Sequence, residues 1–130
     1  IRDRGQSIGY SATFVAKRMS RIAVIAAGYA DGCLRHLSAG NDQQGGHVAF
    51  RGWRAPIVGR VSMDLITVDI TDLEETPIER GDWAEIIGPT ITIEDIGRAS
   101  GTIGYEVLTR LSPRFTRIYI GAADRQPPEA

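Results

Sequence analysis

Short apolar segments, each closed by a glycine or another turn residue, follow one another along this chain of 130 residues. Segments of this kind predict β-strands, and the spacing typical of helices is confined to a small part of the chain. The predicted strands are residues 11–16, 21–27, 47–50, 53–58, 65–70, 82–87 and 117–120. Because helices are too few to connect parallel strands, the pattern favours a mainly β fold built as a small antiparallel β-barrel.

Turn signals indicate how these strands connect. The polar residues 17–20 and the pair Arg51-Gly52 each predict a hairpin between the strands beside them. The polar, glycine-bearing stretch 28–46 predicts a loop, and loops of this length in compact domains are often functional. We expect one domain over residues 1–121, followed by a disordered tail at residues 122–130.

Helix signals are confined to the C-terminal part of the chain. Residues 92–100 predict a helix, with Thr92 as the N-cap, acidic residues in the first turn and Gly101 as the terminating residue. The spacing of apolar side chains predicts a second short helix at residues 103–111.

The composition argues against several function classes. A net charge of −1 gives no electrostatic reason to bind nucleic acid or an anionic membrane, and no apolar run is long enough to span a membrane. Cys33 is the only cysteine, which excludes an internal disulfide and fits a reducing, cytoplasmic setting. His36 and His47 lack partners at metal-ligand spacing, so we assign no metal.

Four motifs contain the residues that could carry chemistry. In chain order they are Gly9-Tyr10-Ser11-Ala12-Thr13, Gly28-Tyr29-Ala30-Asp31-Gly32, Gly59-Arg60-Val61-Ser62-Met63-Asp64 and Thr102-Ile103-Gly104-Tyr105-Glu106, and a closing segment from Leu111 to Tyr119 follows them. Taken singly, a tyrosine beside glycine and a methionine before aspartate are usually packing residues. Taken together and in this order, the motifs resemble the C-terminal domain of the alanine racemase family, which uses pyridoxal phosphate. The resemblance implies a Greek-key-like antiparallel β-barrel with one or two short helices near the C-terminus.

The resemblance also implies roles for single residues. Tyr10 would be the catalytic base on one face of the substrate Cα, while a lysine of another domain serves the opposite face. The backbone N–H of Met63 would contact the substrate carboxylate, and Tyr29 would line the mouth of the pocket. Tyr105 would reach towards the cofactor phosphate. The corridor that admits the substrate would include Arg35, Arg60 and Asp64.

Two questions concern the surroundings of Tyr10. A tyrosine hydroxyl ordinarily titrates at a pH of about 10, so a catalytic tyrosine needs positive charge or hydrogen-bond donors at its oxygen. The sequence shows no such neighbour beside Tyr10, and we expect it to come from the cofactor-binding domain. Ser11 stands where the family commonly has glycine, which costs energy if the backbone takes a positive φ there.

Lys17 is the only lysine of the chain, and its polar surroundings indicate a solvated turn. Pyridoxal phosphate is held through a lysine, so the resemblance implies that another domain binds this cofactor. It further implies alanine as substrate, D-alanine for cell-wall precursors as product, a head-to-tail homodimer, and no activity in the isolated chain. Two alternatives stay open, namely a serine or broad-specificity racemase and a non-catalytic β-barrel interaction module. A lysine domain upstream would distinguish a racemase from the interaction module.

Overall fold

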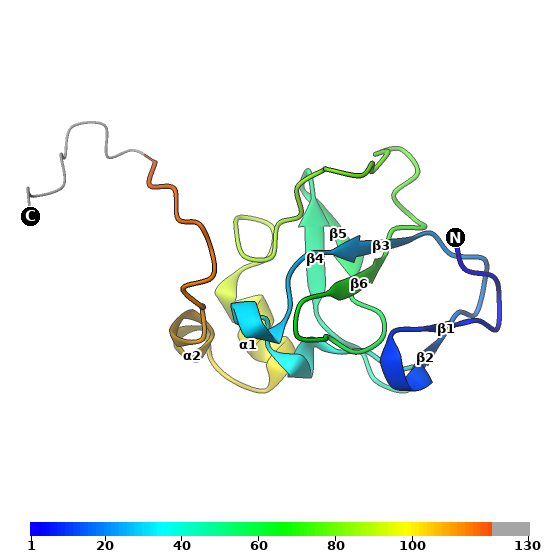
Figure 1. Ribbon diagram of the computed structural model, residues 1–130, viewed down its shortest axis with the longest axis horizontal. Coiled ribbons are helices and arrows are strands. Elements are labelled where there is room, and N and C mark those ends of the chain that lie inside the picture. Colours follow the sequence, from blue (N-terminus) through cyan, green and yellow to red (C-terminus); the bar gives the residue numbers. More distant parts are fainter. Residues whose placement is uncertain (121–130) are drawn as a thin grey trace, which may run out of the picture.

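The strands of the protein pair in antiparallel ladders, as the computed structural model of residues 1–120 describes them. The ladders are β1 (Ser7–Ile8) with β2 (Phe14–Val15), β3 (Ile22–Ile25) with β6 (Ile66–Asp69), and β4 (His47–Phe50) with β5 (Trp53–Pro56). A single bridge between Ile57 and Val68 joins the second ladder to the third. In Figure 1, β3 to β6 lie together at the centre, with β1 and β2 at one side and the two helices at the other. The mainly β class predicted from the sequence is confirmed.

The core lies under the central strands. Ile66 and Val68 of β6 are fully buried, while Thr67 and Asp69 between and after them are half-buried. This alternation is the one expected of a strand with one buried face, and it confirms the strand predicted at residues 65–70. The buried side chains of the loop before α1 and of both helices extend the same cluster to one side.

One of the two predicted hairpins is confirmed. Arg51 and Gly52 both have positive φ, 50° and 86°. Positive φ at both central residues is typical of the two-residue turn whose twist matches that of the flanking strands. The hairpin predicted at residues 17–20 is wrong. β2 pairs with β1 instead. On the other edge of β2, the Asn41 side chain accepts from the N–H of Val15 at 2.7 Å and donates to the Val15 carbonyl at 2.9 Å, where a neighbouring strand would otherwise bond.

Two predicted strands are also wrong. Residues 82–87 form only one bridge, between Glu85 and Ala49, because the Glu85 carboxylate accepts from the N–H groups of Thr90 and Ile91 at 2.8 and 2.7 Å and closes a loop. Residues 117–120 have strand-forming side chains but are exposed and pair with no strand within residues 1–120. The tail predicted at residues 122–130 lies outside the described residues.

Both predicted helices are confirmed, with shorter bounds for the second. α1 (Ile93–Ser100) begins at a capping box, in which Thr92 Oγ1 accepts from the Asp95 N–H and Asp95 Oδ2 accepts from the Thr92 N–H, each at 3.1 Å. Gly101 ends α1 with φ 71°. α2 (Gly104–Thr109) follows and packs against α1. No helical segment of the described residues has the length and apolar character that a membrane span requires.

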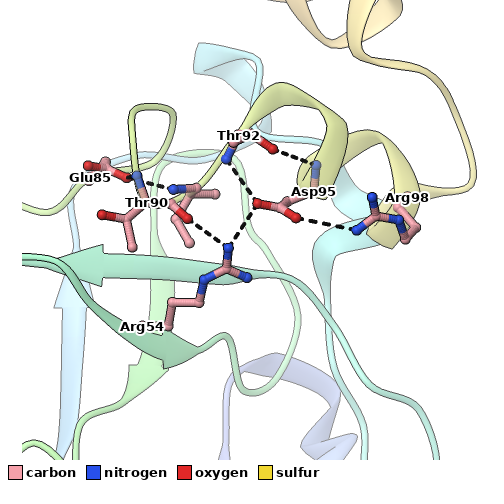
Figure 2. Close-up of polar contacts among 7 residues, drawn as sticks. Arg54, Glu85, Thr90, Thr92, Asp95 and Arg98 are labelled. Carbon is pink, nitrogen blue, oxygen red and sulfur yellow. Dashed lines mark hydrogen bonds and ion pairs between the residues drawn. The ribbon is translucent and has the colours of Figure 1, made fainter.

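Arg54 of β5 fixes the start of α1 to the sheet. Its Nη2 donates to the carbonyl of Thr90 at 2.8 Å and pairs with Asp95 Oδ2 at 3.0 Å, and Arg98 pairs with Asp95 from the next turn (Figure 2). The N–H and hydroxyl of Thr92, followed by the charge of Arg54, hold the pKa of the Asp95 carboxyl below its ordinary value. One carboxylate therefore caps α1 and attaches it to β5.

This arrangement predicts a pH dependence. Because the pKa of Asp95 is lower in the folded chain than the unfolded value of about 3.9, its charge stabilises the fold above that pH and ceases to do so as the pH falls below it. In thermal unfolding, we expect Asp95→Asn to have a lower Tm than the parent chain at pH 7. The difference should shrink below about pH 4. As a control, Asp42→Asn should have the same Tm as the parent chain, because Asp42 is exposed and forms no ion pair in residues 1–120. A Tm difference for Asp95→Asn that stays constant down to the lowest pH would contradict the role assigned to the Asp95 charge.

Candidate functional site

Two of the sequence motifs meet backbone to backbone. The N–H of Tyr29 donates to the carbonyl of Ser62 at 3.0 Å, and the N–H of Ala30 donates to the carbonyl of Met63 at 3.1 Å. A Cβ on Gly28 would lie 2.3 Å from both carbonyl oxygens, so only glycine allows this approach. The motif around Tyr29 is therefore joined directly to the motif around Met63.

Arg114 locks the same two motifs from a third segment. Its Nη2 forms an ion pair with Asp64 at 2.8 Å, and its Nε forms one with Asp31 at 3.3 Å. The hydrogen bond to Asp64, followed by the charge of Asp31, raises the pKa of the Arg114 guanidinium above its ordinary value. Asp31 is buried at the end of the turn η2 (Tyr29–Asp31), where it also accepts from the Gly28 N–H at 2.9 Å. The sequence analysis placed Asp64 in the substrate corridor and did not predict this long-range clamp.

The turn at Met63 leaves a backbone donor open. Ser62 and Leu65 close the turn, with the Ser62 N–H donating to the Leu65 carbonyl at 3.0 Å and the Leu65 N–H donating to Ser62 Oγ at 3.1 Å. Met63 itself is 52% exposed, and its N–H donates to no acceptor in the part of the chain that the structure describes. A fixed, unengaged N–H of this kind can bind an anion without losing side-chain entropy.

Tyr10 stands on a short strained turn, η1 (Tyr10–Ala12). Gly9, Ser11 and Ala12 have φ of 76°, 63° and 49°, so Ser11 does occupy a conformation that favours glycine. A Cβ on Gly9 would lie 3.1 Å from the backbone nitrogen of Arg60, and one on Gly59 would lie 2.7 Å from the carbonyl of Ile8. The backbone before Tyr10 therefore lies directly against the backbone before Arg60.

Two arginines of this chain surround the Tyr10 side chain. Arg35, in the turn η3 (Arg35–Leu37), donates from Nε and Nη2 to the Tyr10 hydroxyl at 3.3 and 3.2 Å. The guanidinium of Arg60 lies over the Tyr10 ring, 5.6 Å from its centroid. The hydrogen bond to Tyr10 raises the pKa of Arg35 above its ordinary value. Positive charge at Tyr10, which was expected from another domain, is thus already present in this chain, on residues 25 and 50 positions away in sequence.

A shallow depression of about 300 Å³ opens beside this group. It is lined by Arg35, Arg60 and the polar side chains of Thr13, His36, Ser38 and Gln43. Ser38 joins the turn that carries Arg35 to the segment that carries Arg60. Its hydroxyl donates to the Arg35 carbonyl at 2.6 Å and accepts from the Val61 N–H at 2.9 Å. Sequence reasoning missed Ser38, and no local pattern around it indicates this contact.

Tyr29 and Tyr105 are less constrained. Tyr29 is 44% exposed next to the joined motifs, and Tyr105 is 79% exposed on α2. Neither hydroxyl makes a hydrogen bond to any residue between 1 and 120. The structure thus brings Tyr10, Arg35 and Arg60 into one group and Met63, Asp64 and Tyr29 into a second, and the Tyr105 hydroxyl makes no hydrogen bond to either group.

The other reactive side chains do not belong to a site. Burial, and then the charge of Asp31, raise the pKa of the Cys33 thiol to about 11, so it is no nucleophile near neutral pH. Lys17 is exposed on the turn after β2. Among the described residues, no three His, Cys, Asp or Glu side chains gather as metal ligands.

Comparison with known proteins identifies the family. The family model for the alanine racemase C-terminal domain matches residues 2–119. The chain belongs to this family. An alanine racemase of Brucella ovis is 47% identical over 118 residues, which are 91% of this chain and 28% of that protein. A catabolic alanine racemase of Rhizobium johnstonii is 50% identical over 115 residues, 88% of this chain and 29% of that protein.

A solved structure agrees with the family assignment. The alanine racemase of Bartonella henselae, determined with covalently bound pyridoxal phosphate, superposes with a TM-score of 0.83 at 46% identity. The match covers 92% of this chain and 32% of that one. The chain therefore spans about a third or less of the length of these alanine racemases.

Proposed function

We propose that this domain is the C-terminal half-site of an alanine racemase that interconverts L- and D-alanine with pyridoxal phosphate. The observation that carries the proposal is the group formed by Tyr10, Arg35 and Arg60, in which an exposed tyrosine hydroxyl accepts two hydrogen bonds from a permanent cation. A packing tyrosine has no need of such surroundings. Relatives bearing the alanine racemase name support the reaction and the substrate.

The proposed task of Tyr10 is proton transfer at the substrate Cα. Racemisation removes a proton from one face of Cα and delivers another to the opposite face. Tyr10 serves one face, and a lysine outside this chain serves the other. Positioned acid–base groups of this kind contribute roughly 10²–10⁴-fold to a rate.

Met63 is proposed to bind the substrate carboxylate through its backbone N–H. Met63 is half-exposed, its N–H is unengaged within residues 1–120, and its turn is held by the contact with Gly28. Asp64 contributes indirectly, since its ion pair with Arg114 fixes the backbone next to the donor. Tyr29 and Tyr105 are proposed to narrow the mouth of the pocket so that a small side chain such as that of alanine enters, and Arg35, Arg60 and Asp64 to border the substrate corridor.

The residues of this chain could contact the cofactor, but they do not include the lysine that would hold it. Pyridoxal phosphate, when bound, withdraws electrons from the substrate and makes its Cα proton removable. Lys17 is exposed beside the ion pair of Arg18 with Asp72, so the lysine that holds the cofactor belongs to another domain. The free hydroxyl of Tyr105 is the group of this chain proposed to reach the phosphate.

The partner of this half-site is proposed to be the lysine domain of a second subunit, in a head-to-tail homodimer. The exposed Tyr10, Met63 and Tyr29 would then face that domain. The buried, unpaired Cys33 is consistent with a cytoplasmic setting, and D-alanine for cell-wall precursors is the proposed product.

The test is made on the full-length protein that contains this domain. We expect it to develop the absorbance of a lysine-bound pyridoxal phosphate and to racemise alanine in both directions. The isolated chain, and the isolated chain with Lys17→Ala, should show neither property. Faster turnover of serine than of alanine would favour a serine or broad-specificity racemase, and a full-length protein without cofactor absorbance would favour the interaction module.

A further inference from the structure

We propose that Arg35 and Arg60 are positioning residues for Tyr10, which they orient and whose negative charge they stabilise during proton transfer. The inference rests on the proposed racemase function and adds to it, because the family resemblance places both arginines only in the substrate corridor. It rests on three observations, which are the donors at the hydroxyl, the cation over the ring and the lack of an ion pair between either arginine and an acid of residues 1–120.

Arg35 fixes the oxygen of Tyr10. Two N–H groups on one side of its guanidinium donate to the same hydroxyl oxygen, at 3.3 and 3.2 Å. An arginine cannot give up its proton near neutral pH, so it donates to the oxygen without entering the proton transfer. The two contacts engage the acceptor side of the oxygen and so restrict where the O–H bond of Tyr10 points.

Arg60 fixes the ring of Tyr10. A guanidinium over a tyrosine ring at 5.6 Å from the centroid is within the range of a cation–π interaction. The close backbone approach of Gly9 to Gly59 and Arg60 sets this position, so it does not depend on a flexible side chain alone. Ser38 ties the turn that carries Arg35 to Val61, the neighbour of Arg60.

Neither arginine forms an ion pair with an acid among residues 1–120. Ion pairs with aspartate occupy Arg18, Arg51, Arg54, Arg98 and Arg114, whereas Arg35 and Arg60 form none within residues 1–120. Their positive charges are therefore directed at Tyr10. Positive charge placed in advance where negative charge develops lowers the barrier of a reaction.

The proton balance shows where that charge is needed. When Tyr10 protonates Cα, its O–H bond breaks, a C–H bond forms, and the oxygen keeps the electron pair as a phenolate facing Arg35. In the reverse direction the phenolate takes the Cα proton, and the electron pair of the broken C–H bond stays on the substrate. Both directions pass through the same charged oxygen, so loss of Arg35 should slow both proton steps on this face.

The experiment distinguishes a positioning role from a corridor role by comparing hydrogen exchange on the two faces of the substrate Cα. In the full-length protein, exchange of the Cα proton with solvent is measured from each alanine enantiomer. For Arg35→Gln we expect exchange on the Tyr10 face to fall by roughly 10- to 100-fold, as expected for loss of hydrogen bonds to a charged group. Exchange on the lysine face and KM should stay within about twofold, and Arg35→Lys, which keeps the charge, should recover part of the loss. Arg60→Gln should lower the Tyr10-face rate by about two- to fivefold.

Two further measurements complete the test. In a Tyr10→Phe background, Arg35→Gln should have no additional effect, since residues that act as a unit are not additive. The ¹³Cζ resonance of Tyr10 should move towards that of free tyrosine in Arg35→Gln, and it should stay unchanged in Arg4→Gln, at an exposed residue of the same type.

The possible failures are distinguishable. An unsubstituted full-length protein that does not racemise alanine would overturn the proposed function. A protein that does racemise alanine, but in which Arg35→Gln raises KM and slows both faces equally, would overturn the positioning role alone. Additive losses in the Tyr10→Phe background, or an unmoved ¹³Cζ resonance, would also overturn it.

Discussion

Tyr10→Phe should lower racemisation of alanine by roughly 10²–10⁴-fold in both directions. The substitution removes the hydroxyl that accepts from Arg35 and leaves the ring under Arg60 nearly unchanged. Exchange of the Cα proton with solvent should nearly vanish from the enantiomer whose proton faces Tyr10. It should survive from the enantiomer whose proton faces the lysine. The measurement is a D/L-alanine assay on the full-length protein together with exchange in deuterated solvent.

Tyr119→Phe is the matched control for this prediction. Tyr119 is 81% exposed, lies outside the two groups of the site and loses the same atom in the substitution. Its rate should stay within about twofold, because a surface change usually costs less than about 0.5 kcal/mol. If Tyr10→Phe behaves like Tyr119→Phe, or if exchange stops equally from both enantiomers, then Tyr10 is not the second base.

Gly28→Ala should destabilise the contact between the two joined motifs. The new Cβ would lie 2.3 Å from the carbonyl oxygens of Ser62 and Met63, and these are backbone atoms that cannot turn aside. We expect the free energy of unfolding to fall by about 1–3 kcal/mol, the usual cost of overpacking. Urea denaturation followed by the fluorescence of Trp53 and Trp83 measures this. In the full-length protein, the displaced Met63 N–H should also raise the KM for alanine.

Gly40→Ala provides the comparison for stability. A Cβ at Gly40 would meet only the carbonyl of Thr13, at 3.2 Å, and its backbone is not in the left-handed region. The cost should be well below that of Gly28→Ala. Equal midpoints for Gly28→Ala and the parent chain would show that the two motifs can separate without loss, and would remove the structural argument for the position of Met63.

Local signals in the sequence were enough to predict part of the fold. The capping residues around Thr92 and the turn at Arg51-Gly52 act within a few residues, and the elements they predicted are present. The alternation of buried and half-buried residues in β6 is equally local. The wrong predictions concern pairing, since the partner of a strand is decided by contacts distant in sequence. The contact of Asn41 with Val15 of β2, 26 residues away in sequence, is one such contact.

The same distinction applies to the site. Tyr10 and Met63 could be singled out because their motifs are short and resemble a known family. The cations around Tyr10 could not, because Arg35 reaches it from 25 residues away and Arg60 reaches it through a close contact of two glycine backbones. The clamp of Arg114 on Asp31 and Asp64 was missed for the same reason, since its members are dispersed along the chain.

That clamp ties the segment after α2 to the joined motifs around Tyr29 and Met63. Arg114 holds Asp31 and Asp64, the Ser112 N–H donates to the Asp31 carbonyl at 3.0 Å, and the Asp31 turn carries the backbone contacts to Met63. Segments tied in this way open and close as one cooperative unit in native-state hydrogen exchange. The amides of Tyr29, Ala30 and Ser112 would then share one opening rate. The lifetime of that closed unit would then limit how long the backbone N–H of Met63, the proposed carboxylate donor, stays in place.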